Sequence, residues 1–308
     1  MVTLAGQTVA HEGTVFLTGK PMLKNRPKTK ILVDGGDPAD TLRMKSLIGF
    51  IDGQTTNPSL VADNPHIKQL LASGHKLSEQ EELDEYRKIV QQISPLVGDA
   101  GVSIEVFADR KTTAREMFKQ AEEMYTWVPN AYIKYPCTAE GLQAAQISVG
   151  RGLRVNMTLC FSQQQAAAVY AATKGTQLPV YVSPFVGRLD DIGQDGMELI
   201  SNVKRMFAKG DGHVLVLTAS VRSLDHLLSS FALESELVTV PARILTLWAE
   251  NNFPLPAESF ARKPVGRPIP FEKLNLEQPW ESFDISHELT SKGIDKFVAD
   301  YRKTVSSV

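Results

Sequence analysis

The sequence predicts an α/β protein folded as a (β/α)8 TIM barrel, and two observations lead to this prediction. Short apolar or β-branched runs alternate with longer segments of helical periodicity along most of the 308 residues, as in chains built from βα units. Eight such alternations fall between residues 30 and 252, which is the number that closes a barrel. A doubly wound open sheet fits the same alternation and is the alternative fold.

The eight expected strands are short runs rich in apolar and β-branched residues. They lie at 30–33, 49–52, 102–106, 131–134, 153–157, 179–182, 214–217 and 237–240. The expected helices lie at 40–47, 78–94, 112–126, 139–151, 162–173, 194–207, 223–229 and 242–252. The second helix has the clearest start, because Ser78 and Glu81 form a capping-box pattern ahead of apolar residues at helical spacing.

Two appendages are expected on this barrel. Residues 1–28 precede the first strand and form an accessory N-terminal arm. Residues 252–271 carry five prolines, which predicts an extended connection over the surface, and an amphipathic C-terminal helix follows at 286–304. We therefore expect one domain over 1–308, with the barrel at 29–252 and the connection and last helix at 253–308.

Composition and charge exclude several classes of protein. The 33 Lys and Arg nearly balance the 35 Asp and Glu, so a nucleic acid or a membrane is not expected as the main partner. No secretory signal and no stretch of 18 apolar residues is visible, and the two cysteines cannot build a disulfide framework. These features predict a soluble, cytoplasmic protein.

No cofactor and no metal are expected either. The six histidines show no metal-binding spacing, and no glycine-rich phosphate loop precedes a helix.

Polar residues at the ends of seven successive strands are the candidates for a functional site, because barrel enzymes carry their chemistry at that rim. In chain order they are Asp34, Thr55, Asn57, Glu105, Lys134, Asn156, Thr158, Ser183, Arg188, Ser220 and Arg222.

Lys134 allows two interpretations. It follows an apolar stretch, so it is either a buried structural partner of a carboxylate or an amine nucleophile that forms a Schiff base with a carbonyl substrate. Asp34 and Glu105 are likewise either ion-pair partners or the groups that move protons for such a lysine.

The amides and arginines are ambiguous in the same way. Asn57 and Asn156 either bond to nearby backbone or hold sugar hydroxyls. Arg188 and Arg222, with Ser220, are either surface ion-pair partners or a clamp for a phosphate.

Seven segments of the chain together resemble the transaldolase family. They are LVDGGD at 32–37, DGQTTNPSL at 52–60, SIEVFAD at 103–109, IKYPCTAEG at 133–141, VNMTLCFSQQQA at 155–166, VSPFVGRLDD at 182–191 and TASVR at 218–222. The resemblance spans almost the whole barrel and implies a class I, Schiff-base enzyme that needs no cofactor and no metal.

The resemblance also implies a role for each candidate. Lys134 would form the Schiff base, Asp34 would take the C4 hydroxyl proton, and Glu105 would move protons through a water held by Thr158. Asn57, Asn156 and Ser183 would bind the dihydroxyacetone unit, Thr55 and Phe185 would shape the pocket, and Arg188, Ser220 and Arg222 would hold the sugar phosphate.

The implied reaction is transfer of dihydroxyacetone from fructose 6-phosphate or sedoheptulose 7-phosphate to erythrose 4-phosphate or glyceraldehyde 3-phosphate, in the pentose phosphate pathway. The alternatives are a fructose-6-phosphate aldolase-type lyase, which residues 135–141 resemble, and a specialised enzyme for an unusual sugar. Phe185 and Arg222 stand where the lyases tend to have tyrosine and lysine, which favours the transferase. A non-enzymatic sugar-phosphate sensor is the remaining alternative. The family further implies sugar-phosphate substrates as the partners and a homo-oligomer, a dimer or larger.

Overall fold

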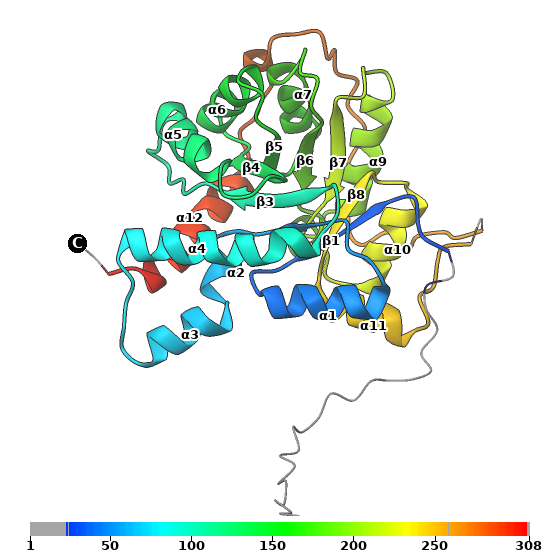
Figure 1. Cartoon of the computed structure of the whole chain (residues 1–308). Coiled ribbons are helices and arrows are strands. Elements are labelled where there is room, and N and C mark those ends of the chain that lie inside the picture. Colours follow the sequence, from blue (N-terminus) through cyan, green and yellow to red (C-terminus); the bar gives the residue numbers. More distant parts are fainter. Residues whose placement is uncertain (1–22, 24, 258, 307–308) are drawn as a thin grey trace, which may run out of the picture.

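Eight parallel strands form a closed barrel in the computed structural model, which describes residues 23, 25–257 and 259–306 (Figure 1). Each strand pairs with its neighbour in sequence, and β1 also pairs with β8 in parallel register. The predicted (β/α)8 barrel is therefore confirmed over the open sheet. The predicted N-terminal arm lies almost wholly outside the described residues.

The strands are β1 Lys30–Asp34, β2 Gly53–Thr55, β3 Gly101–Glu105, β4 Ala131–Pro136, β5 Val155–Cys160, β6 Val180–Pro184, β7 Val214–Thr218 and β8 Leu237–Pro241. The helices are α1 Pro38–Ile48, α2 Pro58–Ala62, α3 Pro65–Ala72, α4 Glu79–Ile93, α5 Ala114–Met124, α6 Ala139–Gly150, α7 Gln163–Ala172, α8 Val186–Asp191, α9 Gly196–Phe207, α10 Leu224–Ala232, α11 Ala242–Glu250 and α12 Glu288–Thr304.

Side-chain caps set where many of these helices begin. The capping box predicted at α4 is present, with Ser78 accepting from the Glu81 amide and Glu81 accepting from the Ser78 amide. Thr113 and Glu116 form a second box at α5. The eight main helices occur within a few residues of their expected positions, because the caps and apolar faces are local sequence features.

The second strand is placed incorrectly by the sequence pattern. The structure begins β2 at Gly53, not at residue 49, because the apolar residues before it pack with residues of α1, β1 and β8 while Gly53 lies against β3. A Cβ on Gly53 would lie 2.7 Å from the carbonyl oxygen of Gly101, so only glycine allows the two strands this close an approach.

Three short helices are absent from the sequence prediction. α2 and α3 lie in the connection after β2, and α8 follows β6 directly. They are too short for a clear helical periodicity, and α8 lacks a side-chain cap.

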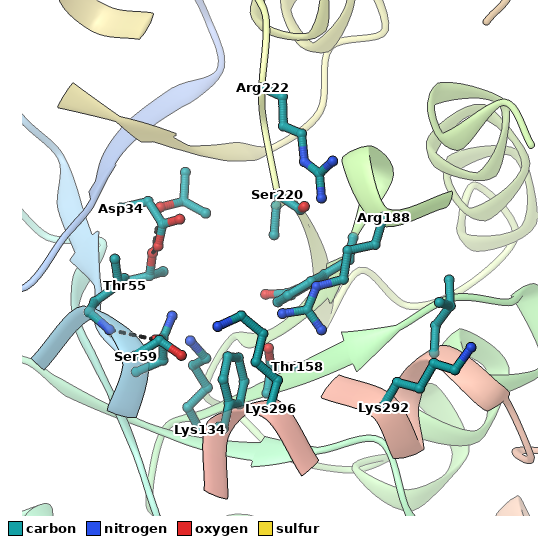
Figure 2. Close-up of a pocket in the computed structure, with 18 of the residues that line it drawn as sticks. Asp34, Thr55, Ser59, Lys134, Thr158, Arg188, Ser220, Arg222, Lys292 and Lys296 are labelled. Atoms are coloured by element: carbon teal, nitrogen blue, oxygen red, sulfur yellow. Dashed lines mark hydrogen bonds between the residues drawn. The ribbon is translucent and has the colours of Figure 1, made fainter. Parts of the chain in front are cut away.

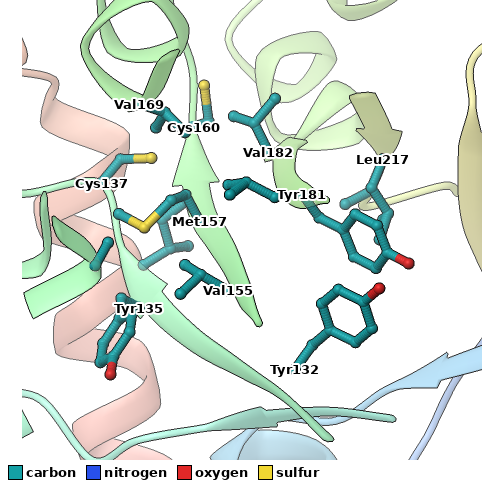
Figure 3. Packing of buried hydrophobic residues seen from close by; sticks show 14 of the residues in the cluster. Tyr132, Tyr135, Cys137, Val155, Met157, Cys160, Val169, Tyr181, Val182 and Leu217 are labelled. Atoms are coloured by element: carbon teal, nitrogen blue, oxygen red, sulfur yellow. The ribbon is translucent and has the colours of Figure 1, made fainter. Parts of the chain in front are cut away.

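Aromatic side chains fill the amino-terminal end of the barrel. Tyr132 of β4 stacks on Tyr181 of β6 with ring centroids 4.2 Å apart (Figure 3). Tyr135 points outward to Ser148 of α6, so β4 alternates regularly and Lys134 shares the inward face with Tyr132. The stacked rings fill this end, and the cavity described below lies at the other.

The C-terminal helix lies across the opposite end. Residues 251–279 form neither helix nor strand where the structure describes them, and α12 then packs against α2 and β5. Thr290 of α12 donates a hydrogen bond to the Leu159 carbonyl, 2.9 Å away. The predicted C-terminal helix is confirmed.

Candidate active site

A cavity of about 500 Å³ opens at the carboxyl ends of the strands, beneath α12 (Figure 2). Every candidate site residue named from the sequence lines it, apart from Glu105 and Asn156. Those lining residues are Asp34, Thr55, Asn57, Lys134, Thr158, Ser183, Phe185, Arg188, Ser220 and Arg222.

Lys134 holds its amine at the floor of the cavity. Its side chain is only 4% exposed, and its Nζ donates to the Thr56 carbonyl oxygen at 2.8 Å. Glu105 Oε2 lies 2.9 Å from the same Nζ, because the register of β3 and β4 sets these two residues side by side. The amine therefore contacts one carboxylate and one carbonyl, and still faces the cavity.

Glu105 lies behind Lys134, away from the cavity surface. Burial raises the pKa of Glu105, and the nearby Lys134 charge acts to lower it. Within the described part of the chain, Glu105 Oε2 and Thr158 Oγ1 are buried and have no hydrogen-bond partner of good geometry. Because buried polar atoms rarely stay unsatisfied, each of these two atoms remains available to a further hydrogen-bond partner.

Asp34 lies at the end of β1, on another side of the cavity. Thr55 Oγ1 donates to its Oδ1 at 2.8 Å and also contacts Thr239 of β8. Burial raises the pKa of Asp34, while Lys134, the Thr55 hydrogen bond and Arg188 act to lower it. Asp34 is thus a carboxyl with an oriented oxygen and a stronger tendency to take up a proton.

The three candidates for sugar binding differ in what they offer the cavity. Asn57 caps α2, and its Oδ1 accepts from the Leu60 amide, so its amide nitrogen is the group left for a ligand. Ser183 donates to Asn156 Oδ1 at 2.7 Å, and Asn156 Nδ2 donates to Ser103 at 3.0 Å. Asn156 therefore lies beneath the cavity surface and orients Ser183, and the structure does not bring it to the surface itself.

Two guanidinium groups reach toward the same side of the cavity (Figure 2). Arg188 lies between the rings of Phe185 and Phe297 and has no ion pair or hydrogen bond among the described residues. Arg222 forms an ion pair with Asp191. The charges of Glu105, Asp34 and Asp191 act on the half-buried Arg188 guanidinium, but its N–H donors have no partner among the described residues. Those donors are therefore available to an anionic ligand.

Two glycines make room for these arginines. A Cβ on Gly187 would lie 2.7 Å from Arg222 Nε, and one on Gly293 of α12 would lie 2.7 Å from Arg188 Nη1. Both are closer than real Cβ contacts, so a side chain at either position would displace the neighbouring arginine.

Several residues that line the cavity are absent from the sequence prediction, chiefly Ser59, Thr239, Lys292, Lys296 and Phe297. Thr239 could have been found by alternation along the eighth strand. The α12 residues recur at helical spacing on one face, but only the fold reveals that this face covers the cavity. With Lys292 and Lys296 added, the cavity holds more cations than carboxylates, which suits a phosphorylated ligand.

The described residues contain no group of three His, Cys, Asp or Glu side chains arranged to hold a metal ion. None of their helices combines the length and apolar character that crossing a membrane requires.

Comparisons with known proteins agree with the geometry. A family model described as Transaldolase/Fructose-6-phosphate aldolase matches residues 31–308. A probable transaldolase of Paracoccus denitrificans is 31% identical over 275 residues, which cover 89% of this chain and 97% of that protein. A probable transaldolase of Dehalococcoides mccartyi is 36% identical over 70% of this chain and 87% of its own. A probable transaldolase of Cereibacter sphaeroides is 32% identical over 91% of this chain and 98% of its own length.

Proposed function

The chain belongs to the transaldolase/fructose-6-phosphate aldolase family, and on this premise we propose that it transfers a dihydroxyacetone unit between sugar phosphates through a Schiff base on Lys134. The observation that supports this most is the buried Lys134 amine facing a cavity that also holds the unpaired Arg188 guanidinium. One end of a ketose phosphate would meet a nucleophile there, and the other end a cation.

The pair of Lys134 and Glu105 provides a way to activate the amine. A buried ammonium and a buried carboxylate both pay a desolvation cost, and transfer of one proton from Nζ to Glu105 removes both charges. The raised pKa of Glu105 favours that transfer. The neutral amine then attacks the C2 ketone of the donor, and loss of water from the carbinolamine leaves a protonated imine.

Asp34 is suited to the bond-breaking step. Its carboxylate would take the C4 hydroxyl proton of the donor, the C3–C4 electron pair would move into the imine, and an aldose phosphate would leave. The bound enamine then attacks the aldehyde of the acceptor, and Asp34 returns the proton. Hydrolysis of the new imine, with a water between Glu105 and Thr158 moving protons, releases the product ketose.

Binding groups explain why the enamine would stay for an acceptor. Asn57 and Ser183 offer hydrogen bonds to the hydroxyls of the retained three carbons, and Asn156 fixes the Ser183 hydroxyl. Phe185 and Thr55 close the sides of the pocket, and Arg188, Ser220 and Arg222 bind the phosphate of either aldose. We expect the enzyme to act as a homo-oligomer in the cytoplasm, without a cofactor.

Borohydride trapping tests the proposal. The chain is mixed with fructose 6-phosphate and borohydride, with or without erythrose 4-phosphate, and intact chains and peptides are analysed by mass spectrometry. We expect a three-carbon adduct on Lys134 that disappears when the acceptor is present, together with sedoheptulose 7-phosphate. Free dihydroxyacetone accumulating without an acceptor would identify a lyase instead.

Other lysines of the same cavity supply the control. Lys134→Met should give no adduct, whereas Lys292→Met should still be trapped, because its amine lies at the mouth of the cavity and is 64% exposed. An adduct on any other lysine, or none with any sugar phosphate, contradicts the proposal.

A further inference from the structure

The loop that follows β7 is held against α8 by a set of contacts that the proposed chemistry does not use. The Val186 amide donates to the Ala219 carbonyl at 3.0 Å, and the Gly187 amide donates to the Ser220 carbonyl at 3.2 Å. The Asp191 carboxylate pairs with the Arg222 guanidinium, but both groups are about half exposed, so this ion pair alone restrains little.

Ser220 is strained within this loop. Its φ is 59°, in the left-handed region that residues other than glycine seldom adopt. Such a conformation costs free energy and persists only when the surroundings hold it from both sides. The α8 amides hold the loop before Arg222, so a second restraint is needed after it.

His226 of α10 supplies that restraint. Its Nδ1 lies 3.2 Å from the Arg222 backbone nitrogen, and its Nε2 lies 2.8 Å from Asp190 Oδ2. Asp190 is itself fixed, because its Oδ1 accepts from the Gly196 amide at 3.0 Å. The His226 side chain is 9% exposed and that of Asp190 is 16%, so water competes little for these bonds.

The partners of the ring define its tautomer. A backbone N–H can only donate, so Nδ1 must accept from Arg222. Nε2 then carries the hydrogen and donates it to the Asp190 carboxylate. The ring thus connects the Arg222 backbone amide, through Nδ1, to Asp190, through Nε2. Asp190 lies two residues after Arg188.

We propose that His226, with Asp190, is a positioning residue that holds the Ser220–Arg222 turn against α8, so that Arg188, Ser220 and Arg222 converge on one oxyanion group. The inference deepens the proposed function, since the oxyanion is taken to be the phosphate of the sugar. It does not depend on Lys134 or on the Schiff base, because it concerns the anion clamp alone.

The chain offers a matched control in His213. Its side chain is 7% exposed and pairs with Asp211, but it precedes β7, at the opposite end of the barrel from the clamp. Replacing it removes another histidine–aspartate pair with a buried histidine, although Asp211 is 49% exposed, without touching the turn at Ser220–Arg222.

The experiment compares His226→Phe, His226→Asn and His213→Phe with the parent enzyme. The readouts are thermal unfolding, kcat and KM for fructose 6-phosphate, and the inhibition constant of inorganic phosphate. The asparagine keeps an acceptor at the place of Nδ1 but is too short to reach Asp190, so it tests the Arg222 bond separately.

We expect His226→Phe to raise both KM and the phosphate inhibition constant about 10- to 100-fold while kcat changes less than about threefold, since loss of a hydrogen bond between charged groups has about this size. His226→Asn should recover part of the loss, and His213→Phe should change neither constant. If His226→Phe and His213→Phe melt alike and bind phosphate alike, the positioning role is wrong. Should no sugar phosphate react with the parent enzyme while phosphate binding by fluorescence or calorimetry still falls in His226→Phe, the proposed function fails and this inference stands.

Discussion

Asp34 and Lys134 face one cavity from different strands, and their separate tasks can be told apart at the scale of single residues. Asp34→Asn keeps a hydrogen-bond acceptor for Thr55 but removes the base, so imine formation continues while C3–C4 cleavage stalls. We expect kcat to fall roughly 100- to 10,000-fold. Borohydride should then trap a six-carbon adduct on Lys134 in place of a three-carbon one. A three-carbon adduct formed at the parental rate would assign the base elsewhere.

Glu82 of α4 is a buried carboxyl that does not line the active-site cavity. Burial raises its pKa from 4.5 to about 7, and no hydrogen bond to its side chain is present among the described residues. Because the folded chain holds this proton more tightly than the unfolded chain, the free energy of unfolding falls as pH rises from about 4.5 to about 7. The charge of Glu82 therefore destabilises the fold above pH 7.

Glu82→Gln should remove this cost, raising the free energy of unfolding by roughly 2 to 3 kcal/mol at pH 8 and by little at pH 4.5. Urea unfolding at the two pH values measures it. Glu79→Gln on the exposed side of the same helix is the control and should have no comparable effect. Equal gains at both pH values would mean that ionisation is not the cause.

Single residues also mark the limit of what the sequence can predict. Side-chain direction along a strand is a local property, so regular alternation along β4 suffices to explain why Lys134 shares the inward face with Tyr132. Alternation cannot tell that the amide of Asn156 bonds to Ser183 and Ser103. Nor can it tell that Arg222 pairs with a carboxylate while Arg188 has no such partner among the described residues. Those facts depend on contacts between residues far apart in the sequence.

At the scale of elements, Asp300 provides one of the contacts that hold α12 over the cavity. Asp300 accepts from Ser59 of α2 at 2.5 Å and from Lys296 and Lys303 of its own helix. Burial acts to raise the pKa of Asp300, but these hydrogen bonds outweigh it and lower the pKa to about 2. The contact therefore stabilises α12 above pH 4 and is lost as pH falls toward 2.

Asp300→Asn should loosen α12 at neutral pH as acid does in the parent enzyme. We expect faster hydrogen exchange over residues 288–304 and a KM for sugar phosphates raised about 3- to 10-fold, because Lys296 and Phe297 lose their fixed positions. Asp295→Asn on the same helix is the control, since its ion pair with Arg110 is exposed and contributes little. Unchanged exchange in Asp300→Asn would show that apolar packing alone holds the helix.

The elements themselves were predictable where the signal is local. Polar caps and apolar faces placed the main helices, whereas the start of β2 depends on the fit of Gly53 against β3 and could not be deduced from an apolar run. The C-terminal helix was expected, but its place over the barrel was not, because a helical face does not reveal what it covers.

At the scale of the whole molecule, the proposed mechanism needs no electron sink other than the protonated imine formed on Lys134. In class II aldol chemistry a bound metal ion polarises the carbonyl, whereas a protonated imine on Lys134 does this without one. We therefore expect dialysis against EDTA to leave kcat unchanged, and borohydride with fructose 6-phosphate to abolish activity in proportion to one adduct per chain. Activity lost to EDTA and restored by a divalent cation would contradict the Schiff-base mechanism. Loss of activity at much less than one adduct per chain would instead mean that the subunits of an oligomer do not act independently.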